Sequence, residues 1–267
     1  NLAPLADIFV NDAFAAAHRA HISIVGFTAV LPSVAGRIME RELKSLSRVL
    51  ESPEKPCVYI FGGAKADDSL QISQYVLENN IADHILTGGV ISHLFLVAKG
   101  FNIGKPSIQF LEKEEVLDLV PGIQKLMKKY PGKIEVPIDV AVNIEGKRKE
   151  LAVNELPTSY SIYDIGTETA KKYGEIIREA KSIVVSGPMG VYENKEFLLG
   201  TKKTFEAVAA SKAFSLVGGG HTVAATKELR LTNQIGYVST AGGALIDFLM
   251  GEALPGVVAL EKAAART

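Results

Sequence analysis

CVYIFGGAK, residues 57–65, joins an apolar run directly to two glycines and a lysine. The apolar run is typical of a buried parallel strand, and glycine lets the following backbone approach a ligand closely. The same arrangement returns in SGPMGVYE (186–193), VGGGHT (217–222) and STAGGA (239–244). Helical patterns follow most of these loops, and a helix N-terminus offers free N–H groups and a partial positive charge. Loops of this kind along one sheet edge predict an anion site, and phosphate is the expected anion.

Composition limits the class of protein. The chain has 267 residues and is 47% hydrophobic, so it can bury a large core in one domain or somewhat more. Its 29 basic and 30 acidic residues nearly cancel, which gives no indication of a nucleic-acid or membrane-surface partner. Cys57, the one cysteine, cannot form an internal disulfide, and no transmembrane or signal-peptide pattern is seen. We therefore expect a cytoplasmic protein.

Strand and helix patterns alternate through most of the chain. Strands are expected near residues 57–61, 84–87, 134–138, 182–186, 214–217 and 236–240. Helices are expected near residues 35–51, 68–79, 90–99, 112–130, 167–179, 196–210, 222–229 and 242–250. The alternation predicts an α/β fold, a doubly wound six-stranded parallel sheet with helices on both faces. Such sheets bind ligands beyond the carboxyl ends of their strands, where all of the glycine loops fall.

Three segments depart from this alternation. Residues 140–153 contain IEGKRKE, which is typical of a hairpin tip. The chain begins abruptly at Asn1 with an apolar run, which we interpret as a fragment of a longer protein. A strand within residues 5–10 should be poorly supported and mobile unless it packs on the helix at 35–51. The C-terminal EKAAART is expected to be a frayed end.

Standard nucleotide and metal fingerprints are missing. There is no GxxxxGK[ST] of a P-loop, and no GxGxxG follows the first strand of the sheet, which disfavours an NAD-dependent dehydrogenase. The five histidines show no metal-ligand spacing, so no metal-ligating residue is assigned. His84 and His93 fit structural roles best.

Lys65 and Glu193 are the strongest single candidates. Asp67, Asp68 and Ser69 are natural N-cap residues for the next helix, so Lys65 stands where a strand ends and a helix begins, facing the expected crevice. Most lysines are simply solvated, and the two preceding glycines favour the functional interpretation. Glu193 suits the hydroxyls of a nucleotide ribose, although GPMGVYE could also form only a rigid turn. Each glycine loop, taken alone, could serve only close helix–strand contact.

Six motifs, in this order, make the chain resemble the phosphoglycerate kinases. They are NDAFAAAHRAH, AGRIMERELKSL, GGAK, GPMGVYE, GGGHT and VSTAGGALIDFLMGEALPGV. That family has two Rossmann-like lobes joined by a long helix, of which the N-terminal lobe binds 3-phosphoglycerate and the C-terminal lobe binds magnesium nucleotide. The resemblance implies a substrate-lobe remnant at 1–34, a linking helix at 35–51, the nucleotide lobe at 52–250 and a tail at 251–267. It also implies a partial second lobe, with the rest of the N-terminal lobe absent.

The resemblance implies roles for single residues. Arg19 resembles an arginine that grips the phosphoglycerate, a task that its planar fork suits. Lys65 resembles the lysine that neutralises charge on the transferred phosphoryl group, Gly220 and Gly242 take catalytic positions, and Glu193 resembles the glutamate that binds the ribose hydroxyls. The implied nucleotide-binding residues are Gly62, Gly63, Lys65, Ser69, Gly88, Gly89, Glu193, Gly218, Gly219, Gly220, His221 and Thr222. N–H groups of residues 218–220 and 241–243 would hold the phosphates, and residues 87–89 and 136–137 resemble segments lining the adenine cleft.

Three positions depart from the family pattern. His221 stands where most members have an aspartate that helps to bind magnesium, so more of the coordination would fall to nucleotide oxygens and water. Ser69 replaces a second lysine of many members, and both variants are similar to archaeal ones. Ala241 replaces a glycine, which costs little if φ there is negative.

The implied function is reversible phosphoryl transfer between ATP and 3-phosphoglycerate, giving ADP and 1,3-bisphosphoglycerate, with Mg²⁺ and ATP or ADP bound. We expect the fragment to bind nucleotide but to be catalytically impaired. The alternative is a non-catalytic, nucleotide-binding Rossmann-like module.

Overall fold

Six parallel strands form the centre of the computed structural model, which describes residues 2–266. Their order is β11-β10-β9-β3-β4-β5, and every neighbouring pair is parallel. The strands are β3 Cys57–Phe61, β4 His84–Thr87, β5 Ile134–Glu135, β9 Ser182–Ser186, β10 Phe214–Gly218 and β11 Tyr237–Val238. The predicted six-stranded parallel sheet is confirmed, with the two edge strands shorter than expected.

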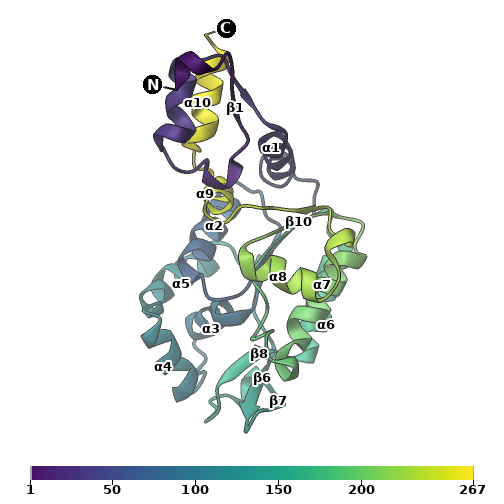
Figure 1. Ribbon diagram of the computed structural model, residues 1–267. Coiled ribbons are helices and arrows are strands. Elements are labelled where there is room, and N and C mark those ends of the chain that lie inside the picture. Colours follow the sequence, from purple (N-terminus) through teal and green to yellow (C-terminus); the bar gives the residue numbers. More distant parts are fainter. Residues whose placement is uncertain (1, 267) are drawn as a thin grey trace.

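Side chains of the sheet alternate between two separate cores. In β3, Tyr59 and Phe61 belong to one core and Val58 and Ile60 to the other, because successive residues of a strand point to opposite faces. Helices cover both faces (Figure 1). The first face carries α1 Arg37–Leu50, α2 Ala66–Glu78, α3 Gly89–Ala98, α5 Val120–Lys129 and α9 Gly243–Leu249, and the second carries α6 Thr167–Glu179, α7 Leu199–Ala210 and α8 Gly220–Glu228.

The helix expected at 112–130 is wrong in its extent. The structure has α4 Lys105–Lys113, then a break, then a one-turn helix Leu117–Leu119 that leads into α5. Glu115 has a φ of 55°, which an α-helix cannot contain, and Pro121 lies in the first turn of α5, where a missing N–H costs nothing.

A small antiparallel sheet extends from the main one, at the lower end of the molecule in Figure 1. The expected hairpin is β6 Asp139–Ile144 and β7 Lys147–Ala152, joined by Glu145 and Gly146, both with positive φ as a tight two-residue turn requires. A third strand, β8 Ile162–Ile165, pairs with β6 and was not expected.

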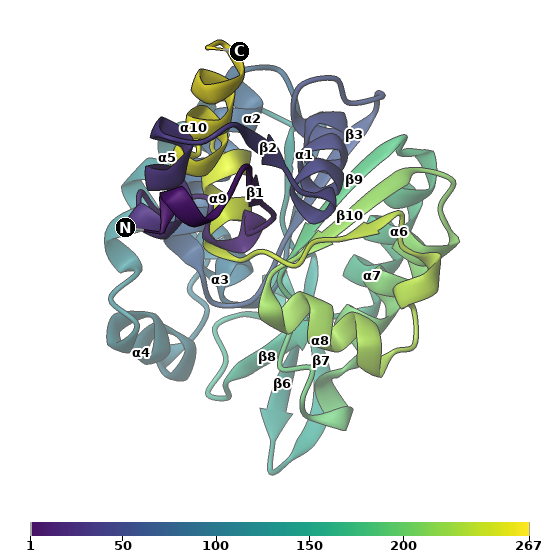
Figure 2. The ribbon, with the colours of Figure 1, turned by 45° about the horizontal axis from the view of Figure 1, so that its top comes forward.

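The first and last segments of the chain pack side by side, above the main sheet in Figure 1, and Figure 2 shows the same packing from another side. β1 Phe9–Asn11 pairs in parallel with β2 Ser33–Ala35, and α10 Pro255–Ala264 packs against this segment, where the N–H of Gly256 donates to the carbonyl of Ala17. Most of the expected frayed end is therefore helix, with Pro255 at a first-turn position. Residue 267 lies outside the described residues. The remaining short helices are Ala3–Leu5, Phe14–Ala16, Ile22–Gly26, Phe27–Ala29, Val153–Glu155, Lys195–Phe197 and Thr232–Gln234.

Helix α1 joins this segment to the sheet. Asp12 caps its first turn, since Asp12 Oδ1 accepts hydrogen bonds from the N–H groups of Ile38 (2.6 Å) and Met39 (3.0 Å). A Cβ on Gly36 would lie 2.4 Å from the Asp12 side chain, so this entry needs glycine. Between residues 2 and 266, the chain forms no helix with the length and apolar character needed to cross a bilayer.

Candidate functional site

A cavity of about 560 Å³ opens at the carboxyl edge of the parallel sheet. All of the glycine-rich loops reach it, because the carboxyl ends of parallel strands meet at one edge. The predicted residues that line it are Gly62, Gly63, Lys65, Ser69, Gly89, Glu193, Gly219, Gly220, His221, Thr222 and Gly242. Gly88, Gly218, Val136 and Pro137 are outside this lining, so the structure does not bring them to the cavity surface.

Backbone contacts between loops explain several glycines. The N–H of Gly63 donates to the carbonyl of Pro188 at 2.8 Å, and a Cβ on Gly62 would lie only 2.1 Å from that oxygen. A Cβ on Gly88 would lie 2.6 Å from Met189 Sδ, and a Cβ on Gly218 would lie 1.9 Å from Leu245. These glycines therefore let the loops and a helix approach one another, which is the close-contact role that the sequence analysis kept open, while Gly62 and Gly63 also line the cavity.

Lys65 is the N-cap residue of α2, and its side chain is 73% exposed. Its Nζ lies 3.6 Å from Asp68, an exposed pair that leaves the ammonium accessible from the cavity. Asp67 and Asp68 lie in the first helical turn and not at the N-cap, contrary to expectation. Ser69 is buried, and its hydroxyl donates to the carbonyl of Lys65 at 2.9 Å. The backbone of Lys65 is thus fixed at the start of α2, while its ammonium group is exposed.

Glu193 and His221 meet at the mouth of the cavity, from different loops. Glu193 Oε1 lies 3.7 Å from His221 Nδ1, and the His221 ring stands edge-on to Tyr192 with 6.4 Å between ring centroids. Burial and the nearby Glu193 and Glu228 charges raise the pKa of Tyr192. The two loops are joined below this pair, where the N–H of Gly187 donates to Thr222 Oγ1 at 2.7 Å. The sequence did not predict this contact.

Two helices begin at the cavity with unblocked N-termini. Gly219 is the N-cap of α8 and Gly242 is the N-cap of α9, and neither forms a side-chain cap hydrogen bond. A Cβ on Gly220 or Gly242 would meet nothing within 4 Å, so these glycines border open space. First-turn N–H groups without intrahelical partners suit an anion. Ala241 is buried and is not among the positive-φ residues, so its replacement of glycine costs little.

Arg19 lies outside the cavity lining but close to its rim. Arg19 Nε donates to His18 Nε2 at 3.3 Å. His18 Nε2 in turn lies 2.8 Å from where a Cβ on Gly243 would stand, at the start of α9. The arginine is exposed, and its segment packs against the same helix that borders the cavity. The structure therefore places it near the glycines of STAGGA.

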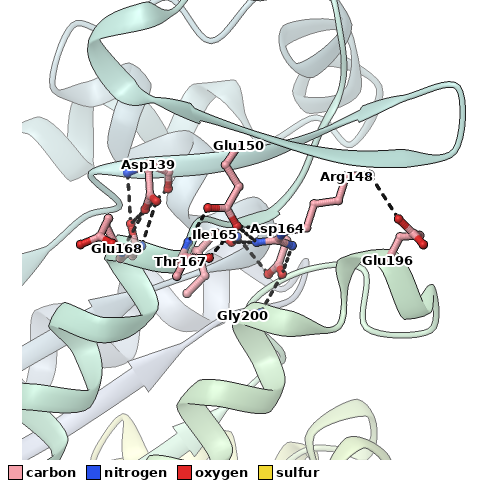
Figure 3. A network of polar contacts seen from close by, with 10 residues as sticks. Asp139, Arg148, Glu150, Asp164, Ile165, Thr167, Glu168, Glu196 and Gly200 are labelled. Carbon is pink, nitrogen blue, oxygen red and sulfur yellow. Dashed lines mark hydrogen bonds and ion pairs between the residues drawn. The ribbon is translucent and has the colours of Figure 1, made fainter.

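One end of the cavity was missed by the sequence interpretation. Strand β8 supplies Ile162, Tyr163 and Asp164 to it, together with Phe110 of α4 and Met189. The IYDI pattern of β8 is short, but its apolar alternation is the signal that could have revealed it. Burial raises the pKa of Asp164 to about 6, against hydrogen bonds from the Gly200 N–H and Arg148 that lower it (Figure 3).

His93 also lines this end and is almost fully buried on α3. Burial lowers the pKa of its imidazole to about 4, so the ring is neutral at neutral pH. The expected structural role of His93 therefore has to be widened, since the ring also forms part of the cavity wall. His84 starts β4 and lies outside that wall. Among residues 2–266, no group of three histidine, cysteine or acidic side chains is placed to hold a metal ion.

Comparisons with known proteins agree on one family. The phosphoglycerate kinase family model matches residues 1–252. The chain is 46% identical over 266 residues to a phosphoglycerate kinase of Methanothermus fervidus, which covers 100% of this chain and 65% of that protein. It is 48% identical to that of Methanococcus maripaludis over 263 residues, covering 98% of this chain and 63% of that protein.

The fold agrees as well. The crystal structure of phosphoglycerate kinase from Pyrococcus horikoshii OT3 superposes with a TM-score of 0.92 at 40% sequence identity, covering 100% of this chain and 66% of that one. The chain thus spans somewhat under two thirds of the length of the curated relatives it matches. With a family model over nearly all of its length, and relatives of this identity and fold, the chain belongs to the phosphoglycerate kinase family.

Proposed function

We propose that the cavity binds a magnesium nucleotide. The observation that supports this most is the meeting of the glycine loops, the open N-terminus of α8 and the exposed ammonium of Lys65 around one space. An ammonium and unpaired N–H groups attract the same kind of ligand, an anion with several oxygens.

The cavity has ends of different chemistry, which suits the parts of a nucleotide. Ile162, Met189 and Phe110 form an apolar end for the base. Glu193 would accept hydrogen bonds from the ribose hydroxyls, since its exposed carboxylate faces the mouth. Gly220 and its neighbours at the start of α8 would bind the phosphates.

We propose phosphoryl transfer between ATP and 3-phosphoglycerate, in both directions, as the reaction. The acceptor is a carboxylate, so no general base is needed and catalysis depends on positioning and charge stabilisation. Lys65 would neutralise charge on the moving phosphoryl group, and the N–H groups beside Gly220 and Gly242 would hold its oxygens. Arg19 would bind the phosphoglycerate. The similarity to phosphoglycerate kinases supports this assignment.

The side chains at the cavity fit a magnesium ion that is carried mainly by the nucleotide. Asp68 and Glu193 are acidic groups in the lining, but the described residues form no three-ligand cluster, and His221 stands in the phosphate-facing loop. Mg²⁺ commonly keeps several waters and binds through substrate phosphates, so nucleotide oxygens and water would supply most of its ligands. The bound ion would screen phosphate charge beside Lys65.

We also propose that the 267-residue chain alone binds magnesium-ADP but turns over slowly, because it spans under two thirds of its relatives and Arg19 is its one assigned phosphoglycerate contact. Isothermal titration calorimetry with magnesium-ADP tests the binding, with NAD as the comparison ligand. ADP should bind and NAD should not. A well-folded chain that binds no ADP would overturn the proposed site. The other informative case is a chain extended to its relatives' length that binds ADP and still shows no phosphoglycerate-dependent ATP turnover. That result would support the alternative of a non-catalytic nucleotide-binding module.

A further inference from the structure

The hairpin that interrupts the α/β alternation sends one side chain toward the cavity wall. Arg148 of β7 is only 13% exposed, and its Nη1 donates to Asp164 Oδ2 at 2.8 Å. Its Nε and Nη2 donate to Glu150 Oε1 at 3.0 and 2.8 Å, and Nη2 also donates to the carbonyl of Ile165 at 2.8 Å. Figure 3 shows this guanidinium between the hairpin and β8.

Asp164 needs this partner because its side chain is 0% exposed. A buried carboxylate costs free energy unless a charge and hydrogen bonds compensate it. Arg148 is the cation that faces it from β7, beside the carboxylate of Glu150, while Glu196 Oε2 approaches the backbone N–H of Arg148 at 3.5 Å. Two backbone N–H groups complete the set, from Ile165 at 2.9 Å and Gly200 at 2.7 Å.

The same carboxylate supports the loop that carries Glu193. A Cβ on Gly190 would lie 2.4 Å from Asp164 Oδ1, so the loop rests directly on this side chain. The N–H of Val191 donates to the carbonyl of Tyr163, the neighbour of Asp164, at 2.8 Å.

A second support runs through α7. Asp164 holds the Gly200 N–H in the first turn of α7, whose N-cap Leu198 forms no side-chain cap. The next residue, Thr201, accepts a hydrogen bond at Oγ1 from the N–H of Met189 at 3.0 Å. The loop is therefore held from β8 and from α7, and Asp164 joins both supports.

We propose that Arg148 is a positioning residue for the cavity: by compensating Asp164, it fixes the loop of residues 187–193 and hence Glu193. The expected effect of Arg148 on nucleotide affinity rests on the proposed function. Its expected effect on the loop of residues 187–193 can be measured without a ligand. The hairpin would thus stabilise the wall of the cavity through Arg148, which does not itself contact the substrate.

Hydrogen exchange of residues 187–193 tests the proposal without nucleotide, in wild type, Arg148→Gln, the double variant Arg148→Gln/Asp164→Asn and the matched control Lys149→Gln. Lys149 is exposed on the same strand, so its variant makes the same charge change. At about pH 8 the loop amides of Arg148→Gln should exchange about tenfold faster than in wild type, as expected for a lost charged hydrogen bond. The double variant should recover, because no buried charge is left, and Lys149→Gln should match wild type.

The pH dependence separates this from general damage. At about pH 5.5, where the Asp164 carboxyl of Arg148→Gln is protonated, the difference from wild type at that pH should shrink to about twofold. Equal exchange in wild type and Arg148→Gln at about pH 8, or equal losses at both pH values without recovery in the double variant, would overturn the proposal.

Arg148→Lys covers the case that Arg148→Gln does not fold, because it keeps the charge but loses the planar fork. Its loop amides should exchange about threefold faster at about pH 8, and unchanged exchange would count against the proposal. Magnesium-ADP titrations of the same variants complete the test. We expect weaker ADP binding in the variants whose loop amides exchange faster, and unchanged binding in the others. Absent ADP binding in wild type would contradict the proposed function, whereas the exchange result would still decide the role of Arg148.

Discussion

Glu42 of α1 holds Thr240 of the STAGGA loop, although 198 positions separate the two residues. Glu42 Oε1 accepts hydrogen bonds from both the backbone N–H and the hydroxyl of Thr240, each at 2.7 Å. Its Oε2 accepts a third from the hydroxyl of Ser239 at 2.9 Å, and the glutamate is 0% exposed. Helix α1 is thereby attached to the loop that leads into α9.

Removing this carboxylate should destabilise the protein strongly. Glu42→Ala leaves the buried Ser239 hydroxyl and the part-buried Thr240 donors without their acceptor, and we expect a loss of about 3 kcal/mol in the free energy of unfolding. Urea denaturation measures this loss. Glu40→Ala is the control, since Glu40 forms only an exposed pair with Lys44 and should change stability by about 0.5 kcal/mol or less. Similar losses in the two variants would show that the Glu42 contacts contribute little.

Lys65→Ala should separate turnover from binding. In a chain extended to its relatives' length, turnover should fall by about a hundredfold or more, because in the proposed reaction the ammonium would stabilise charge that develops on the transferred phosphoryl group. ADP affinity, measured by calorimetry, should stay largely unchanged. Lys99→Ala, which removes an exposed lysine at the far end of α3, is the matched control. Near-normal turnover of Lys65→Ala would refute the assigned role.

Two glycine substitutions should have opposite profiles. Gly62→Ala places a Cβ 2.1 Å from the carbonyl oxygen of Pro188, so stability should fall by about 3 kcal/mol. Gly220→Ala meets nothing within 4 Å, so stability should stay within about 0.5 kcal/mol of wild type. Its methyl group would project beside the phosphates, however, and weaken ADP binding by about tenfold. Thermal unfolding with and without ADP distinguishes the two, and full ADP affinity in Gly220→Ala would argue against phosphates at the start of α8.

Asp164 should give stability a defined pH dependence. Burial raises the pKa of this carboxyl from the usual 3.8 to about 6, so the folded chain binds its proton more tightly than the unfolded chain does. The stabilising contribution is present below about pH 4 and is lost as the pH rises through about 6. Relative to Asp164→Asn, wild type should lose about 2 kcal/mol of unfolding free energy between about pH 4.5 and about pH 7.5.

Denaturation of wild type and Asp164→Asn at both pH values measures this difference. Carboxyls with lowered pKa values, such as Asp83 and Glu78, are present in both proteins and cancel. A difference between the two proteins that does not change with pH would show that Asp164 stays ionised throughout.

The strands and loops of the main sheet were predictable because each carries its own local signal. Five successive buried residues in β3 are followed by glycines, and β9 has a similar pattern, so the parallel sheet and the edge that carries the cavity could be predicted from the sequence. Lys65, Glu193 and Gly220 therefore fell at the cavity as predicted.

Contacts between distant segments were not predictable in the same way. Asp164 lies on a four-residue strand, and its partners Arg148 and Gly200 are 16 and 36 positions away. Gly218, which was assigned to a ligand, lies outside the cavity lining, because the sequence signal of a glycine does not distinguish approach to phosphate from approach to a neighbouring side chain. The helix at 255–264 was missed although Pro255 and the apolar residues after it are a helix-start signal.

The packing of α10 against the N-terminal segment affects the order in which parts of the chain can fold during synthesis. The carbonyl of Ala17 accepts a hydrogen bond from the N–H of Gly256, and the carbonyl of Thr28 accepts one from Arg266. The segment around Arg19 is therefore covered by residues that are synthesised more than 200 positions later. At about 5–20 residues per second, the intervening stretch takes on the order of tens of seconds to make. During this time the main sheet can fold around its cavity, while the segment that carries Arg19 still lacks its packing against α10. In a nascent chain, the cavity of the main sheet could therefore form before the segment that carries Arg19 gains its packing against α10.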